Sequence, residues 1–371
     1  MPKPNVPGRA LTVAWRDLVH PYMTPDIKRS IWQIVNTVVP LAALYFLMYQ
    51  SLGYSYWLTL ALAFPAAGFM VRVFIIMHDC GHGSFFQSST ANHWLGTICG
   101  ILVNTPYFRW TQEHTIHHAT SGDLDRRGVG DVVTLTIKEY LSRTKWHRFK
   151  YRLYRHPFVT FGIGPHYIFL FNLRFVGKRS GQRERRGVYL TNAALFTLWT
   201  LSIWSLGLPA VLLIWVPVQI ITGVSGVWLF YVQHQYEDTY WQPNKHWDYA
   251  TAALMGSSYY KLPRLLQWFS GNIGFHHIHH LCAKIPNYKL EACHLENPAF
   301  QQARTLTFWK SLRCMNLKLW DEDRQRLIGF RELKKLRSMS LATAIPEFDG
   351  GVAKLEPCPS SGLHVSGSNQ E

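Results

Sequence analysis

Three short clusters of histidine could carry chemistry in this sequence, which contains 18 histidines among 371 residues. They are His78-Asp-Cys-Gly-His82 (box one), His114-Thr-Ile-His117-His118 (box two) and His276-His277-Ile-His279-His280 (box three). Spacings of three and four residues bring side chains to one face of a helix, so each box predicts a one-sided group of imidazoles, with His277 pointing elsewhere. Neutral imidazoles bind iron, zinc, copper or nickel, and the boxes therefore predict a metal site.

A ninth candidate ligand, His234, stands alone in the segment Val-Gln-His-Gln-Tyr-Glu-Asp. A single histidine usually packs at an interface, but three clusters at helical spacing reverse that expectation. Nine imidazoles exceed what one ion with ordinary coordination uses, so two metal ions are the economical interpretation. His-Glu-x-x-His does not occur in the sequence, which excludes the usual intramembrane zinc protease.

Four carboxylates adjoin these candidate ligands: Asp79, Glu113, Glu237 and Asp238. Each is placed to accept the second ring N–H of an imidazole and so fix its orientation. A solvated surface position is the alternative for each of them.

A charged loop, residues 123–131, is interpreted as a set of bracing ion pairs that includes Asp131. Trp110 is interpreted as an anchor at the membrane interface rather than as part of a substrate tunnel.

The elements that must position the histidines are membrane helices. Only 16% of residues are charged, and two long blocks, residues 31–71 and 187–236, contain no Asp, Glu, Lys or Arg. Each block is long enough for two crossings of ~20 residues. We therefore predict an all-α integral membrane protein with four transmembrane helices, at about residues 31–50, 57–77, 188–206 and 209–232. This excludes a simple soluble protein.

The distribution of basic residues predicts the orientation. Of the 38 Lys and Arg, 5 precede the first span, 16 lie in residues 109–186 and 16 follow the fourth span. The remaining one, Arg72, lies near the inner end of the second span and is interpreted as structural. This bias places both termini and the middle segment in the cytoplasm. All nine histidines can then converge at one membrane face, in a cytoplasmic histidine-rich cap.

The rest of the chain is assigned by composition. Residues 1–30 form a cytoplasmic N-terminal segment, residues 31–298 the membrane domain, residues 299–337 a cytoplasmic helical segment, and residues 338–371 a disordered tail. Residues 93–108 are apolar but short and contain glycine and proline, which predicts a re-entrant or interfacial piece. The basic run of residues 174–186 is expected to contact anionic lipid headgroups, with an acidic partner as the alternative.

The boxes and their surroundings resemble the membrane fatty acid desaturases, most closely the bacterial and plastid-type acyl-lipid enzymes of the delta-12/omega-6 group. The resemblance covers roughly residues 26–298. Its motifs are HDCGHGSFF (residues 78–86), HTIHH (114–118), DLDRRGVGD (123–131), HQYEDTYW (234–241) and GNIGFHHIHHL (271–281).

This resemblance implies a di-iron centre and an oxygen-dependent reaction. The implied metal ligands are His78, His82, His114, His117, His118, His234, His276, His279 and His280; for His234 the resemblance, rather than spacing, makes the assignment. Two irons, dioxygen and two external electrons would convert adjacent methylenes of a fatty acyl chain into a cis double bond. The acyl chain is expected on a membrane lipid or a thioester, and the location in the bacterial inner membrane.

Two alternatives remain at this point. A related membrane di-iron hydroxylase or ketolase acting on an alkyl or carotenoid substrate would share the boxes. A metal transporter would carry its ligands near the middle of the membrane, whereas these histidines lie at its boundary. The expected partners are a fatty acyl lipid, membrane lipids and an acidic electron donor such as ferredoxin, attracted by a formal net charge of +16; no nucleic acid is expected.

Overall fold

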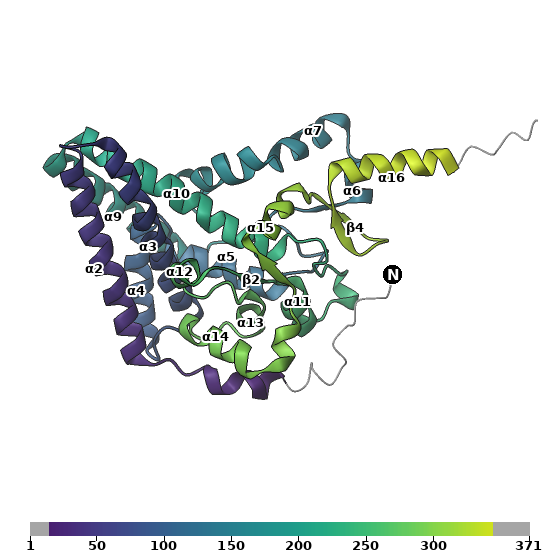
Figure 1. Ribbon diagram of the computed structural model, residues 1–371, viewed down its shortest axis with the longest axis horizontal. Helices are drawn as coiled ribbons and strands as arrows, with labels where there is room; N and C mark the ends of the chain where they lie inside the picture. The colour runs from purple at the N-terminus through teal and green to yellow at the C-terminus, as the bar shows by residue number, and fades with distance from the viewer. Residues whose placement is uncertain (1–14, 344–371) are drawn as a thin grey trace, which may run out of the picture. The chain divides into compact units, whose positions relative to one another are not determined.

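The structure is a computed structural model that describes residues 15–343. Most of these residues are helical (Figure 1). The chain divides into a large unit, which ends at Phe330, and a second unit that begins at Arg331. The described part of the second unit is helical and belongs to α16 (Phe330–Thr343). The tail predicted to be disordered begins at residue 338 and so starts inside this helix. Residues 344–371 of that predicted tail lie outside the described residues.

Four long helices cover the predicted spans: α2 (Ile27–Ser51), α3 (Tyr56–His82), α9 (Gln182–Leu206) and α10 (Leu208–His234). Three of them, α2, α3 and α10, are long and apolar enough to cross a membrane. The chain is therefore a membrane protein with at least these candidate spans. α9 does not reach the same hydropathy, because its first turn is charged and threonine, asparagine and serine interrupt its apolar part. Its crossing stays a prediction.

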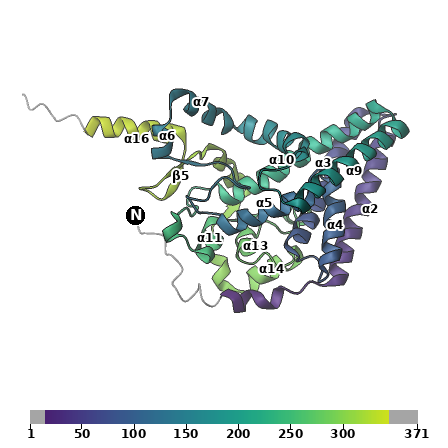
Figure 2. The ribbon, with the colours of Figure 1, turned by 180° about the vertical axis from the view of Figure 1, so that it is seen from behind.

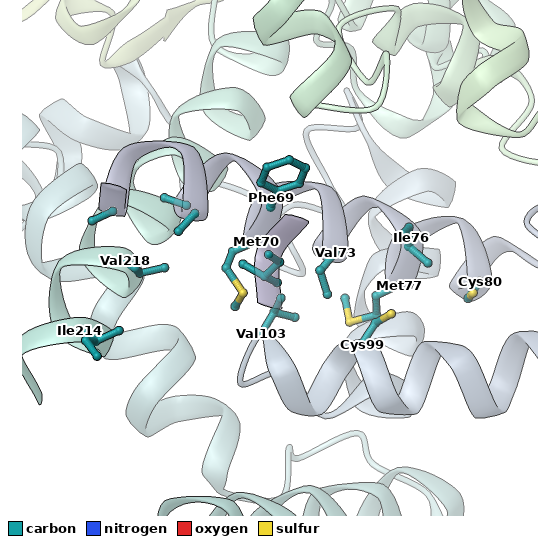
Figure 3. Close-up of a cluster of buried hydrophobic side chains, with 14 of the residues drawn as sticks. Phe69, Met70, Val73, Ile76, Met77, Cys80, Cys99, Val103, Ile214 and Val218 are labelled. Atoms are coloured by element: carbon teal, nitrogen blue, oxygen red, sulfur yellow. The ribbon is translucent and has the colours of Figure 1, made fainter. Parts of the chain in front are cut away.

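α3 lies at the centre of the membrane part. It is the most buried of the three apolar helices, and α2, α4 (Ser89–Leu102) and α10 pack against it. Figure 3 shows Met77 of α3 facing Cys99 of α4, with Val218 of α10 further along the same cluster. Burying such apolar side chains contributes roughly 25 cal/mol per Å². This packing fixes the end of α3, where box one lies.

The predicted re-entrant piece is the helix α4 followed by a tight turn. At 14 residues α4 is about 21 Å long, too short to cross a hydrocarbon core of about 30 Å. It lies beside α3 in both ribbon views (Figure 1 and Figure 2). A Cβ on Gly96 would lie 2.3 Å from the Tyr107 ring, and the turn then places Asn104 at φ 55°. The turn leads directly into α5 (Tyr107–Thr120), which carries box two.

The segment between box two and α9 contains more helix than the sequence analysis foresaw. Its elements are α6 (Ile137–Ser142), α7 (Lys145–Tyr154), η2 (Phe158–Ile163), α8 (Gly164–His166), η3 (Tyr167–Phe171) and η4 (Asn172–Arg174). The stretch from η2 to η3 is a nearly continuous helix of π and α turns with several exposed aromatic side chains. The charge of this segment predicts that all of it is cytoplasmic, and that location stays a prediction.

The part after α10 carries box three on a short helix. Its helices, with the short η1 (His20–Tyr22) before α2, are η5 (Asn244–His246), α11 (Tyr249–Gly256), α12 (Arg264–Phe269), α13 (His276–Leu281), α14 (Asn287–Glu296), η6 (Pro298–Gln302), α15 (Phe308–Ser311) and η7 (Leu312–Asn316). α13 packs against α11 and α14, and its apolar Ile278 and Leu281 are buried between them. Box three is thereby held by a small apolar core of its own.

The structure contains two small β-sheets, so the all-α prediction was wrong for these short segments. The strands are β1 (Leu135–Thr136), β2 (Tyr259–Lys261), β3 (Thr305–Thr307), β4 (Leu319–Asp321) and β5 (Arg326–Ile328). β1 pairs in parallel with β4, which pairs antiparallel with β5, and β2 pairs in parallel with β3. Residues 299–337 thus contain three strands where only helix was expected, because tertiary pairing decides strands this short.

Candidate metal centre

The three boxes lie at the ends of helices that converge. Box one forms the last turn of α3, which Gly83 ends in a left-handed conformation (φ 63°). Box two forms the C-terminal part of α5, and box three begins α13. His234 is the last residue of α10. Gly81 of box one lets α5 come close, since a Cβ there would lie 3.0 Å from the Thr111 hydroxyl.

Five histidines form the first group. Their ligand atoms all lie within 4.8 Å of one another, and the members are His78, His82, His114, His118 and His279. The Nε2 atoms of His118 and His114 are 3.1 Å apart, and those of His279 and His118 are 3.0 Å apart. All three boxes contribute to this group, so its assembly requires the native packing of α3, α5 and α13.

A second group lies next to the first. The ligand atoms of His117, His234 and His280 lie within 4.8 Å of one another, and His276 Nε2 is 2.9 Å from His234 Nε2. The rings of His118 and His280 stack 4.1 Å apart, which places the two groups side by side. All nine histidines singled out in the sequence are thus in one of two adjoining clusters.

Burial and mutual proximity favour the neutral form of five of these imidazoles. Loss of hydration, followed by the charge of neighbouring histidines, lowers the pKa of His114, His118, His276, His279 and His280 well below its usual value. Neutral rings with an unprotonated nitrogen are the form that binds a metal cation. His82 and His114 are partly exposed, whereas the other seven are buried.

The nitrogen contacts also fit metal ions. Nε2 atoms of neighbouring rings approach within 2.9–3.2 Å at four places. The buried Nε2 atoms of His82 and His280 have no hydrogen-bond partner among the described residues. Leaving a buried polar atom unpaired costs about 1–3 kcal/mol, and a shared cation would satisfy several of these nitrogens at once. The donor set therefore fits two metal ions with nitrogen ligands.

Comparison with known proteins agrees with this geometry. A family model described as fatty acid desaturase matches residues 55–311, which include all three boxes and His234. A fatty acid desaturase of Bacillus subtilis is 46% identical over 326 residues, covering 88% of this chain and 92% of the relative. The chain belongs to the fatty acid desaturase family. The chain is thus an enzyme, and the resemblance drawn from the boxes is confirmed.

More distant relatives are also desaturases. The sn-1 oleoyl-lipid 12-desaturase of Synechocystis sp. is 26% identical over 241 residues, covering 61% of this chain and 64% of the relative. The sn-1 acyl-lipid omega-3 desaturase (ferredoxin) of the same organism is 26% identical over 233 residues, covering 59% and 61%. These relatives favour the desaturase over the hydroxylase, ketolase and transporter alternatives.

Two carboxylates of the desaturase lie within hydrogen-bonding distance of box histidines. Asp79 Oδ1 lies 3.1 Å from His78 Nδ1, a contact compatible with the orienting role predicted for it, which stays a prediction. Its Oδ2 accepts hydrogen bonds of 2.8 Å from both the backbone N–H and the side-chain amide of Asn287. That amide also exchanges hydrogen bonds with Gln33 of α2. A buried polar chain therefore connects a membrane helix to a candidate ligand.

The second carboxylate beside a box histidine, Asp131, was missed in the sequence. Its Oδ1 lies 2.5 Å from Nδ1 of the buried His117. Gly130 makes this approach possible, because its φ is 67° and a Cβ would lie 3.0 Å from the Cβ of His117. The sequence pattern predicts Asp131 in a set of bracing ion pairs. That set does contain Arg126 with Asp123, at 2.5 Å. An aspartate after a glycine was the only local signal.

The other three expected carboxylates point elsewhere. Glu113 pairs with Arg109 of the same helix at 3.0 Å. The half-exposed Glu237 and Asp238 pair with Arg326 at 2.5 Å and Arg304 at 3.2 Å. In each case a nearby guanidinium attracts the carboxylate away from the histidines. We therefore withdraw an orienting role for all three.

Three aromatic and basic residues complete the surroundings. Trp110 stacks on His114 at a ring distance of 4.4 Å, so it lies against a candidate ligand, and its interpretation as an interfacial anchor stays a prediction. Arg72 is buried, donates to Thr37 and to the Trp268 carbonyl, and has a structural role as expected. His277 faces away from both groups, as predicted, and its Nε2 lies 3.2 Å from His294 Nδ1.

Proposed function

We propose that this desaturase is an oxygen-dependent, two-iron enzyme that introduces a cis double bond into a fatty acyl chain of a membrane lipid. The observation that carries the proposal is the pair of adjoining histidine groups at the ends of apolar helices. In the proposed reaction the acyl chain loses two hydrogens from adjacent methylenes. Dioxygen, two external electrons and two protons, together with these hydrogens, yield two water molecules.

The nine histidines are proposed as the iron ligands. The first group, with five imidazoles, would hold one iron, and His117, His234, His276 and His280 would hold the other. Bound iron supplies the oxidising power that removal of hydrogen from an unactivated methylene requires, since such a carbon offers no acidic proton and no leaving group. Histidine ligands are neutral and leave coordination positions open for dioxygen.

The remaining residues of the site position and shield these ligands. Asp79 and Asp131 would each hold the Nδ1–H of a histidine, which turns the Nε2 lone pair toward the metal. Trp110 covers one face of the His114 ring. Burial of most of the histidines excludes water, which favours reaction with the substrate over side reactions.

The proposed topology has four crossings, with the histidines and both termini on the cytoplasmic side of a bacterial inner membrane. Box one ends α3 and His234 ends α10, which supports placing both at the same boundary. A reporter inserted at Gly53 should then indicate the outer side, and a reporter at the C-terminus the cytoplasm. An external signal from the C-terminal reporter would contradict the four-span arrangement.

An acidic iron-sulfur protein of the ferredoxin type is the proposed electron donor. Two relatives carry ferredoxin in their names, including the chloroplastic sn-2 acyl-lipid omega-3 desaturase of Arabidopsis thaliana. The exposed Arg183, Arg185 and Arg186 of α9 form a candidate docking site. α9 packs against α5, so these arginines share a helix pair with box two. Anionic lipid headgroups are the alternative ligand of this cluster.

The activity is tested by the fatty acids of a host that expresses the chain. Gas chromatography with double bonds located by mass spectrometry should show a new cis-unsaturated acid in the phospholipid fraction. The variant His279→Ala, expressed to the same level in the membrane, should not form it. A hydroxylated product would contradict desaturation, and a product first appearing on a thioester would contradict the lipid substrate.

A further inference from the structure

The helix α7 has two opposite faces. Its Tyr151 is buried, whereas Trp146, Phe149 and Leu153 are 61%, 54% and 52% exposed. Their spacing of three and four residues places the exposed three in one stripe. The rings of Trp146 and Phe149 stack 5.5 Å apart at an angle of 16°. An exposed stripe of large apolar side chains indicates a surface that another apolar phase covers.

Basic side chains border this stripe. Lys145, Lys150 and Arg152 are exposed, and α7 contains no acidic residue. Lys150 Nζ lies 5.6 Å from the centre of the Trp146 ring, so its aliphatic stem follows the apolar stripe. A tryptophan-containing apolar stripe flanked by lysine and arginine is typical of helices that lie in the headgroup layer of an anionic bilayer.

The anchor of α7 places it at the histidine-bearing end of α10. Directly after α7, the fully buried Arg155 donates to the Tyr231 hydroxyl at 3.2 Å and to Gln235 Oε1 at 2.8 Å. These two partners flank His234, the last residue of α10. Because α10 is long and apolar enough to cross a membrane, its end marks the boundary of the hydrocarbon region.

The chain after α7 continues along α10 toward its middle. Phe161 of η2 packs against Trp228 and Tyr231 at 5.1 and 5.0 Å, and a Cβ on Gly223 would lie 3.2 Å from Pro165. From Tyr231 to Gly223 is about 12 Å along a helix. This run has no charged residue between Arg155 and Arg174, and it exposes Phe158, Ile163, Tyr167 and Phe171.

We propose that α7 lies in the headgroup layer of the leaflet next to the histidine groups and binds anionic phospholipid there. The apolar run that follows would lie in the hydrocarbon just beneath, beside α10. An acidic soluble protein would match the basic residues but would leave the stripe of Trp146, Phe149 and Leu153 without an apolar partner. Because α7 exposes both an apolar stripe and basic side chains, an anionic lipid matches it better than an acidic protein does.

The test uses photocrosslinking of the full chain in nanodiscs with equal amounts of phosphatidylglycerol and phosphatidylcholine. A benzophenone amino acid replaces Phe149 or, in a second protein, Leu153. The control replaces Asp323, an exposed residue in the turn between β4 and β5. Mass spectrometry of the adducts should show severalfold more lipid at 149 and 153 than at 323, with phosphatidylglycerol enriched over its share in the disc.

Charge removal then tests the anionic preference. Lys145→Gln with Lys150→Gln should return the lipid ratio at 149 to that of the disc, whereas Lys334→Gln with Lys335→Gln in α16 removes the same charge and should leave the ratio unchanged. Equal lipid adducts at 149, 153 and 323 would overturn the proposal. So would an unselective lipid ratio in the parent protein, or adducts with an added ferredoxin in place of lipid.

Discussion

The two faces of the short helix α13 carry the same residue type at similar burial, yet they differ in what they face. His276, His279 and His280 point toward histidines of α3, α5 and α10. His277 points the other way, toward His294 and the ring of Tyr259, in a small apolar core. A buried histidine is therefore not by itself a metal ligand. Convergence of nitrogens from several histidines distinguishes the site.

The largest difference is expected between His279→Ala and His277→Ala. Loss of His279 removes one of five nitrogens from the first group, so activity should fall to background and iron content should drop. Loss of His277 removes a side chain that touches neither group, and should cost mainly stability, about 1–3 kcal/mol for the unpaired His294. Activity, iron per chain and melting temperature are measured on both purified variants.

These two variants are matched in helix, residue type and burial. If both lost iron equally, the two faces of α13 would not differ and the assignment of box three would be wrong. Retention of full activity by His279→Ala would contradict its role directly.

A smaller effect on iron affinity or activity is expected from Asp131, the carboxylate that contacts the candidate ligand His117. Asp131→Asn keeps the size of the side chain but weakens its hold on His117 Nδ1, and should reduce iron affinity or activity roughly 10- to 100-fold. Glu237→Gln is the matched control, because Glu237 pairs with Arg326 away from the histidines. Chelator titration of both variants measures the affinity. Equal affinities would show that Asp131 does not orient His117.

The histidine boxes were predictable because helical spacing alone determines which side chains share a face. The convergence of His78 and His234 was also predictable, since the predicted four-span topology brings the ends of their helices to one boundary. Asp131 was not, because its contact depends on how a glycine-containing loop folds back onto α5. The same holds for Glu237 and Asp238, whose arginine partners lie 89 and 66 residues away. Glu113 differs, because its partner Arg109 lies one helical turn away and their spacing of four residues was a readable signal.

The fold likewise has parts that the sequence predicts and parts that it does not. Long apolar helices follow from composition, and α2, α3 and α10 appear where predicted. The short strands β1 to β5 depend on pairing between distant segments, and a charge count could not reveal them. The apolar run after α7 was overlooked because basic residues on either side of it dominated the interpretation.

A still smaller effect on iron affinity is expected at Asn287, which contacts the carboxylate of Asp79 rather than a histidine ligand. Asn287→Ala removes the amide that holds Asp79, which in turn contacts His78. Iron affinity should fall by less than in Asp131→Asn, because the carboxylate itself remains. Asn297→Ala, a change of the same type just beyond α14, should leave affinity unchanged. A loss in Asn287→Ala larger than that in Asp131→Asn would show that the Asp79 chain, rather than Asp131, dominates the orientation of the ligands.

The smallest effect is expected at the surface. Changing Arg183, Arg185 and Arg186 to Gln should slow donor-dependent turnover a fewfold at low salt and flatten its salt dependence, with iron content unchanged. Salt screens such steering over about 8 Å at physiological ionic strength. Stopped-flow reduction by an acidic ferredoxin measures the rate. An unchanged rate at low salt with saturating lipid would exclude donor docking at this cluster.

The most direct test of the central claim is the metal content of the active enzyme. Protein purified without chelator should contain two irons per chain by mass spectrometry of the metals, counted against quantitative amino-acid analysis, and its activity should rise in proportion to iron. One ion per chain, or zinc in a fully active enzyme, would contradict the account.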